Sequence, residues 1–138
     1  MGEWDERNVD TYDKQRTRIL LVDDEADFTS LLKINLERTN EYEVRTENVP
    51  TKALAAAQAF RPDLVILDFM MPGMDGGDVA AALRADHALK DTLILFLTAA
   101  VNKPEVDGWV NKISGPCLAK PVTPEELIAW IQVHLKRG

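Results

Sequence analysis

Three short runs of consecutive apolar residues constrain the fold of this chain more than any other feature. They span Ile19–Val22, Leu64–Leu67 and Leu93–Leu97. A strand with one face in solvent alternates apolar and polar residues, whereas an unbroken aliphatic run is typical of a strand buried on both faces. Because apolar residues at helical spacing occur between these runs, the pattern predicts a parallel sheet with helices on both faces.

Two weaker segments bring the predicted strands to five. Tyr42–Thr46 alternates in polarity, as an edge strand does, and Cys117–Ala119 is a short apolar run. The strands therefore alternate with helices in a doubly wound α/β fold, for which we expect the flavodoxin-like strand order 2-1-3-4-5.

Apolar spacing and capping signals place the predicted helices. The first carries a stripe for the core that consists of Phe28, Leu31, Leu32 and Leu36. The last begins at a capping box, Thr123-Pro124-Glu125-Glu126. Pro104 and Gly108 interrupt the segment 102–114, so the helix expected there is short or distorted.

Length and composition narrow the class of protein. At 138 residues the chain forms one domain, which we place at residues 17–138, after a polar, flexible arm at residues 1–16. No apolar run approaches the roughly 20 residues of a membrane span, and the chain starts without a signal core, so we expect a cytoplasmic protein with no membrane partner. Acidic residues outnumber basic ones by 23 to 16, which gives a net charge of -7 and predicts no direct contact with nucleic acid.

Polar residues follow four of the predicted strands at the point where each strand ends. They are Asp23 and Asp24, Asp68, Thr98 and Lys120. In a parallel sheet these ends share one edge, and the expected strand order makes the first and third strands neighbours. The sequence therefore predicts that the three aspartates converge, with Thr98 and Lys120 beside them.

Three carboxylates that converge repel one another, so cations must offset their charge. Lys120 supplies one positive charge, and an all-oxygen donor set with no His or Cys favours Mg²⁺ as the other. A carboxylate beside Mg²⁺ and an ammonium is suited to accept a phosphoryl group, which the Thr98 hydroxyl could then hydrogen-bond.

With these motifs the sequence resembles the receiver domain of two-component response regulators, over about residues 17–137. The resemblance rests on VDDE at the first strand, LDFMMPGMDG at the third, LTA at Thr98 and KP at Lys120. It implies Asp68 as the phosphoacceptor, Mg²⁺ bound by Asp23, Asp24, Asp68 and the backbone carbonyl of Met70, and catalytic roles for Thr98 and Lys120. It also implies a cis bond before Pro121. The sequence departs from the family at Cys117, where an aromatic residue is common.

The resemblance implies a switch and not an enzyme with an external substrate, although the chain would catalyse its own phosphorylation and dephosphorylation. The donor would be a histidine kinase or phosphotransfer protein, and the response would reach a downstream protein target, with a phosphorylation-dependent dimer left open. Alternatives are a phosphorylation-independent scaffold, the isolated receiver of a larger transcription factor or hybrid kinase, and an aspartate-nucleophile phosphatase. The phosphatase class usually has a second acid at the position of Met70.

Overall fold

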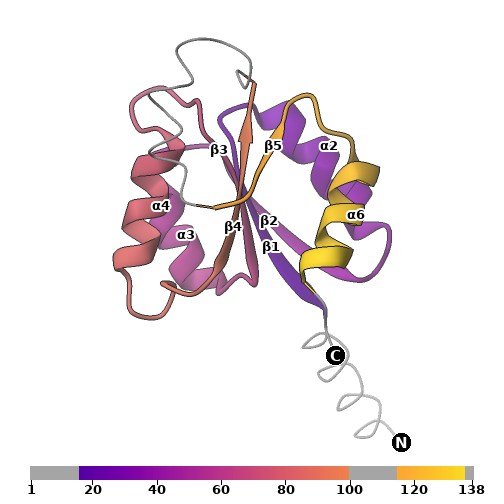
Figure 1. The fold of residues 1–138 in the computed structure, drawn as a ribbon, viewed down its shortest axis with the longest axis horizontal. Helices are drawn as coiled ribbons and strands as arrows, with labels where there is room; N and C mark the ends of the chain where they lie inside the picture. Colours follow the sequence, from indigo (N-terminus) through magenta and orange to yellow (C-terminus); the bar gives the residue numbers. More distant parts are fainter. Residues whose placement is uncertain (1–15, 100–114, 136–138) are drawn as a thin grey trace, which may run out of the picture.

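The computed structural model describes residues 16–99 and 115–135 of the chain. Within them a five-stranded parallel sheet has the order β2-β1-β3-β4-β5, which confirms the predicted order (Figure 1). The strands are β1 (Thr17–Val22), β2 (Tyr42–Glu47), β3 (Leu64–Asp68), β4 (Leu93–Thr98) and β5 (Cys117–Ala119). Since every pair is parallel, all carboxyl ends lie along one edge of the sheet.

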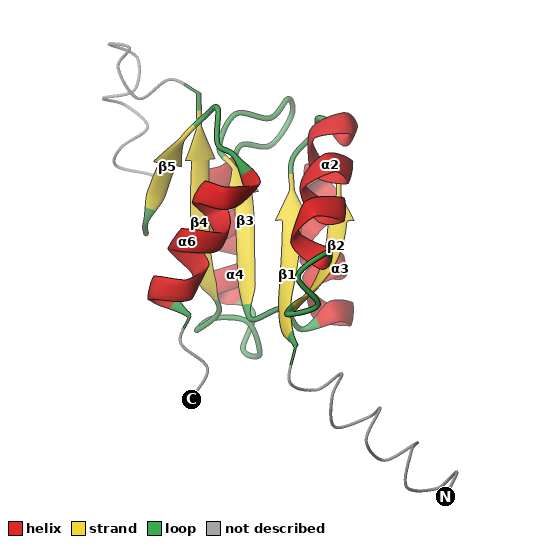
Figure 2. Cartoon of the chain, turned by 90° about the vertical axis from the view of Figure 1, so that its right-hand side faces the viewer, coloured by secondary structure: helices red, strands yellow, loops and turns green. Residues whose placement is uncertain are grey.

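Helices cover both faces of the sheet, so the molecule has three layers. Figure 1 shows α3 and α4 on one face and α2 and α6 on the other, and Figure 2 shows α2 and α6 in front of the strands. The helices are α2 (Ala26–Glu37), a 3-10 turn η1 (Pro50–Lys52) that leads into α3 (Ala53–Phe60), α4 (Gly76–Ala85) and α6 (Pro124–His134). No described helix is long and apolar enough to pass through a lipid bilayer.

The core divides into two apolar clusters, one on each face of the sheet. Successive residues of β1 alternate between them: Leu20 and Val22 belong to the cluster under α3 and α4, and Ile19 and Leu21 to the cluster under α2 and α6. All five residues of β3 are buried. The unbroken aliphatic runs are therefore explained by burial of both faces.

The predicted stripe on α2 was wrong at one position. Leu32 and Leu36 are buried, but the side chain of Leu31 is 60% exposed and that of Ile34 is 54% exposed. The face that meets the sheet is instead completed by Thr29, a buried polar residue whose hydroxyl bonds the carbonyl of Ala26. Helical spacing alone did not show which side of a wide apolar stripe faces the core.

The turn between β3 and α4 is fixed by backbone contact and by a cap. A Cβ added to Gly76 would lie 2.8 Å from the carbonyl oxygen of Asp68, so no larger residue fits there. Asp75 and Asp78 form a capping box at the start of α4, and Gly73 has φ +85°. The expected arm at residues 1–16, but for Arg16, and the irregular helix at 102–114 lie outside the described residues.

Candidate functional site

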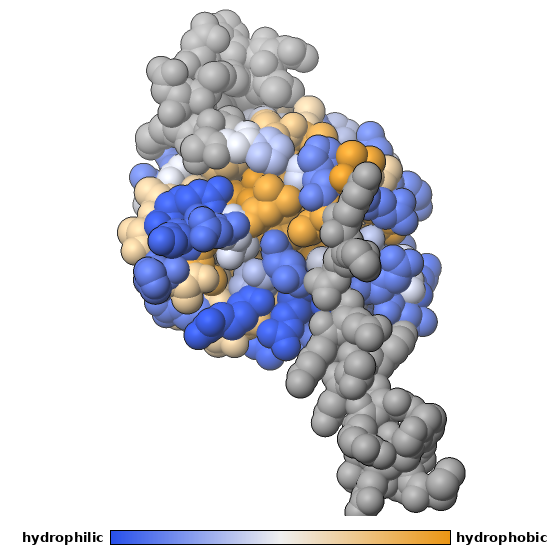
Figure 3. Space-filling view, turned by 60° about the horizontal axis from the view of Figure 1, so that its bottom comes forward, coloured by the Kyte–Doolittle hydropathy of each residue, from blue (hydrophilic) through white to orange (hydrophobic). Residues whose placement is uncertain are grey.

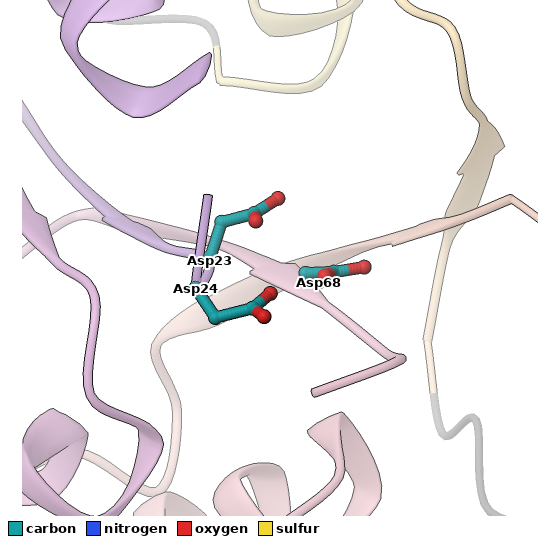
Figure 4. Close-up of side chains that lie close together, drawn as sticks. All are labelled: Asp23, Asp24 and Asp68. Atoms are coloured by element: carbon teal, nitrogen blue, oxygen red, sulfur yellow. The ribbon is translucent and has the colours of Figure 1, made fainter. Parts of the chain in front are cut away.

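The three predicted aspartates meet at the carboxyl edge of the sheet. Asp23 follows β1 and Asp68 ends β3, and these strands are adjacent, with Val22 beside Leu67. One carboxylate oxygen from each of Asp23, Asp24 and Asp68 lies within 4.8 Å of the others. Figure 4 shows the three side chains pointing toward one space. Asp23 and Asp68 are buried, at 2% and 4% exposure, and Asp24 is exposed.

Hydrogen bonds from two loops hold Asp23 in place. Its Oδ1 accepts a bond from the backbone N–H of Glu25 at 2.9 Å, and its own N–H donates to the carbonyl of Glu47 at 3.2 Å. Asn48 Nδ2 donates to the backbone carbonyl of Asp23 at 2.8 Å and to the Thr29 hydroxyl at 2.9 Å. Asn48 was not predicted as a site residue, because nothing in the sequence links it to Asp23.

Lys120 brings the cation to this cluster from the end of β5. Its Nζ lies 2.7 Å from Asp23 Oδ2 and 3.6 Å from Asp68 Oδ1. Two further contacts come from the start of α2: Glu25 Oε1 at 3.3 Å and the ring centroid of Phe28 at 4.7 Å. Neither residue was predicted as part of the site: Phe28 was expected only in the apolar stripe of the first helix, and Glu25 is the third acid of the VDDE motif.

Thr98 is the last residue of β4 and is buried at 1% exposure. The register pairs Asp68 with Leu97, the residue before Thr98, and pairs Thr98 with Ala119, the residue before Lys120. Its carbonyl accepts a bond from the N–H of Lys120 at 2.9 Å. The predicted residues Asp68, Thr98 and Lys120 therefore stand at the ends of three neighbouring strands. The Lys120–Pro121 bond is cis, as expected.

Burial and charge perturb the titration of this cluster. Burial raises the pKa of Asp68 from its usual 3.8 to about 6, and the charge of Asp23 adds to the effect while Lys120 opposes it. Burial also raises the pKa of Asp23, against the hydrogen bond from Lys120. Burial acts to lower the pKa of Lys120, but its bond to Asp23 and the charge of Asp68 outweigh it, so that pKa is raised. One ammonium thus does not fully offset the buried carboxylates.

The donor set fits a hard divalent cation. The cluster offers carboxylate oxygens from Asp23, Asp24 and Asp68, and no His or Cys belongs to this group among the described residues. Oxygen ligands with room for water are what Mg²⁺ prefers in proteins, and a dication would offset the charge that raises the pKa of Asp68. The arrangement can hold a metal beside a buried carboxylate.

The structure also places two other positions that the sequence singled out, Met70 and Cys117. The N–H of Met70 donates to Asp68 Oδ1 at 3.3 Å, and its side chain is 45% exposed. Cys117 is half-buried against the core cluster under α3 and α4, and burial raises the pKa of its thiol. Cys117 therefore packs as a small apolar residue at the position where the family commonly has an aromatic residue.

Comparison with known proteins finds relatives that are named response regulators or transcriptional regulators. Over 126 residues the chain is 38% identical to the DNA-binding response regulator MtrA of Mycobacterium tuberculosis, a match of 91% of this chain and 54% of the relative. Over 121 residues it is 35% identical to the alkaline phosphatase synthesis transcriptional regulatory protein PhoP of Bacillus subtilis, which covers 88% and 49%. The chain thus spans about half the length of these relatives.

These relatives correct one prediction. The net charge of -7 had suggested that nucleic acid plays no part, but MtrA is named a DNA-binding response regulator. The expectation of no nucleic-acid partner is therefore wrong. The charge argument failed because it concerns only the electrostatics of these 138 residues, and the match covers 54% of MtrA.

A solved structure and a family model complete the comparison. The chemotaxis protein CheY4 of Vibrio cholerae matches with a TM-score of 0.76 and 32% identity, over 87% of this chain and 99% of that one. The model of the response regulator receiver domain matches residues 19–132, which include every predicted site residue. From its fold, its acidic cluster and these matches, the chain belongs to the response regulator receiver domain family.

Proposed function

We propose that Asp68 accepts a phosphoryl group with the help of Mg²⁺, and that this modification switches the protein between two signalling states. The observation that carries the proposal is the buried carboxylate of Asp68, which lies within reach of two further acids and of the Lys120 ammonium. Such crowding is costly for a structural residue, and it is suited to a site that binds a dication and a phosphoryl group. A chain with this role acts on itself and turns over no external metabolite.

The transfer is a substitution at phosphorus. An ionised carboxylate oxygen of Asp68 forms the new O–P bond while the N–P bond of a phosphohistidine breaks. The electron pair of the broken bond stays on the imidazole nitrogen, which takes up a proton. This chemistry favours a histidine kinase or a phosphotransfer protein as the donor. Water would later cleave the O–P bond and restore Asp68.

Each neighbour of Asp68 has a separate task in this proposal. Asp23, Asp24, Asp68 and the backbone carbonyl of Met70 would hold Mg²⁺, which neutralises charge on the phosphoryl oxygens when bound. Lys120 would bind one of those oxygens through its ammonium, and Thr98 would hydrogen-bond another. The buried positions of Asp23 and Thr98, at 2% and 1% exposure, support these roles, since both side chains lie at the carboxyl edge of the sheet beside Asp68 and Lys120.

The output of the switch follows from the location of Thr98. It ends β4, and its carbonyl bonds the N–H of Lys120, so a shift of Thr98 toward a phosphoryl group would disturb the end of β5 as well. We propose that this movement changes a surface that a downstream protein recognises. A cytoplasmic location and a separate arm at residues 1–16 stay predictions of the sequence.

Labelling by a small phosphodonor tests the proposal. The protein is incubated with an acyl phosphate or a phosphoramidate, and intact mass spectrometry counts the phosphoryl groups that are gained. We expect one group on the native chain, none on Asp68→Asn, and none when a chelator removes Mg²⁺. Asp91→Asn is the matched control, because Asp91 is an exposed aspartate away from the cluster, and it should label normally. Undiminished labelling of Asp68→Asn would overturn the proposal.

A further inference from the structure

The Lys120 ammonium lies at different distances from its three acidic neighbours. Its ammonium has three protons to donate, and its hydrogen bonds reach Asp23 at 2.7 Å and Glu25 at 3.3 Å. The distance to Asp68 is 3.6 Å, which is too long for a hydrogen bond. In this state Lys120 is therefore held more closely by Asp23 and Glu25 than by Asp68, the residue that would receive the phosphoryl group.

The two acidic partners differ in how firmly they are held. Asp23 is buried, and its carboxylate also accepts a bond from the N–H of Glu25. The Glu25 side chain is 67% exposed and makes no capping bond to α2, although Glu25 stands at the N-cap position. Among the described residues, Lys120 is the ion-pair partner of Glu25. Glu25 is therefore the partner that Lys120 can release most readily.

We propose that Glu25 is a positioning residue that holds the Lys120 ammonium back from Asp68 until a phosphoryl group competes for it. The inference rests on the proposed function, because it concerns the same reaction at the same carboxylate. The ring of Phe28 lies 4.7 Å from Lys120 Nζ and keeps the ammonium on the α2 side of the cluster. When the phosphoryl group arrives, Lys120 exchanges the oxygen of Glu25 for a phosphoryl oxygen.

This exchange predicts that Glu25 affects one direction of the reaction. The contact with Glu25 is present before transfer and is broken in the transition state, so its loss lowers the barrier to phosphorylation. Once Asp68 is phosphorylated, Lys120 is bound to the phosphoryl group both before and during hydrolysis. The rate of dephosphorylation therefore does not depend on Glu25. A residue with a merely structural role would not separate the two rates in this way.

The test compares labelling and dephosphorylation rates of three variants at saturating Mg²⁺. For Glu25→Gln, labelling by a small phosphodonor should accelerate about twofold to fivefold, the range expected for an exposed ion pair, with unchanged dephosphorylation. Glu25→Asp keeps the charge but shortens the side chain by one methylene, so it should behave like Glu25→Gln. Asp27→Asn removes an exposed charge from the first turn of α2, without contact to Lys120 among the described residues, and should match the native chain.

Each possible result of this experiment either supports or overturns the inference about Glu25. Acceleration in both Glu25 variants but not in Asp27→Asn supports the inference. Labelling of Glu25→Gln at or below the native rate overturns the inference. Equal acceleration in Asp27→Asn, or a native labelling rate in Glu25→Asp, also overturns it, because either result would indicate a long-range effect of charge. Labelling of Asp68→Asn would instead overturn the proposed function, so the two failures are distinguishable.

Discussion

Charged side chains are paired differently at the two edges of the sheet, the edge where the strands begin (the amino edge) and the edge where they end (the carboxyl edge). At the amino edge, Arg18 is matched by acids and acceptors: its N–H donates to Asp63 Oδ2 at 2.8 Å, its guanidinium donates to the carbonyl of Phe60 at 3.0 Å, and Glu43 lies at 3.8 Å. Figure 3 views the molecule from this end, where polar residues surround a smaller apolar area. At the carboxyl edge, the ammonium of Lys120 is shared by Asp23, Glu25 and Asp68, and of these Asp23 and Asp68 are buried.

The difference separates structural charges from functional ones. Matched charges at the amino edge join β1 to the loops before β3 and can be exposed to water. At the carboxyl edge, burial and the charge of Asp23 raise the pKa of Asp68, which costs stability at neutral pH and fits the proposed binding of Mg²⁺ and a phosphoryl group. Changes at the carboxyl edge should therefore alter phosphorylation, whereas changes at the amino edge should alter stability alone.

The largest effect is expected from removal of the one shared cation. Lys120→Met should slow labelling of Asp68 about 100-fold, because a preorganised donor to the phosphoryl oxygens is lost. In the absence of metal, Lys120→Met should also be less stable than the native chain, since Asp23 and Asp68 would stay buried without their counter-ion. Labelling kinetics and urea unfolding measure the two effects. Native labelling by Lys120→Met would show that the ammonium is a structural counter-ion alone.

Next in size is the effect of Asp68 on stability without metal. The folded pKa of about 6 exceeds the usual 3.8, so the folded protein binds this proton more tightly than the unfolded chain does. The contribution of Asp68 to stability is therefore highest below its unfolded pKa and is lost as the pH rises toward 6. Asp68→Asn should raise the free energy of unfolding at neutral pH by on the order of 2 kcal/mol.

Urea unfolding in a chelator, at several pH values, checks this sign. The gain in Asp68→Asn should shrink as the pH falls from about 6 to the unfolded pKa of 3.8 and should be absent below it, and saturating Mg²⁺ should reduce the gain at neutral pH. A gain that stays constant with pH would mean that the substitution acts through packing and not through the charge of Asp68.

A smaller change is expected at the exposed acid of the cluster. Asp24→Asn should weaken Mg²⁺ binding about tenfold, since one charged ligand becomes neutral while the fold is unaffected. Calorimetric titration with Mg²⁺ measures the affinity, and Asp27→Asn serves as the control for loss of charge alone. Equal weakening in both variants would remove Asp24 from the metal site.

The smallest effect is expected at the amino edge. Arg18→Met should cost about 1 kcal/mol of stability, because one hydrogen bond and an exposed ion pair are lost. Labelling of Asp68 and Mg²⁺ affinity should stay at native values. A change in either would show that the two edges are coupled through β1, and the contrast between them would fail.

The sequence alone predicted most of this architecture for a physical reason. Strands buried on both faces must be continuously apolar, so β1, β3 and β4 were visible as runs, and the residues at their ends marked one edge of the sheet. The Thr123 capping box likewise identified the start of α6, and the structure contains it.

Contacts between distant segments were not predictable in the same way. Glu25 and Lys120 are 95 positions apart, and no spacing rule joins them before the sheet is assembled. Asn48 meets Asp23 only because β2 lies beside β1. The exposure of Leu31 depended on how α2 is rotated against the sheet, which its apolar spacing did not determine.

The shortness of β5 has a consequence for how the site can fail. β5 has three residues and, in the described part of the chain, pairs with β4 alone, yet Lys120, which contacts the buried acids, directly follows it. Its separation from β4 would cost less free energy than the separation of any longer strand. Local unfolding of β5 would move the Lys120 ammonium away from Asp68 while the central strands stay folded. The protein would then lose phosphorylation before it loses its overall fold.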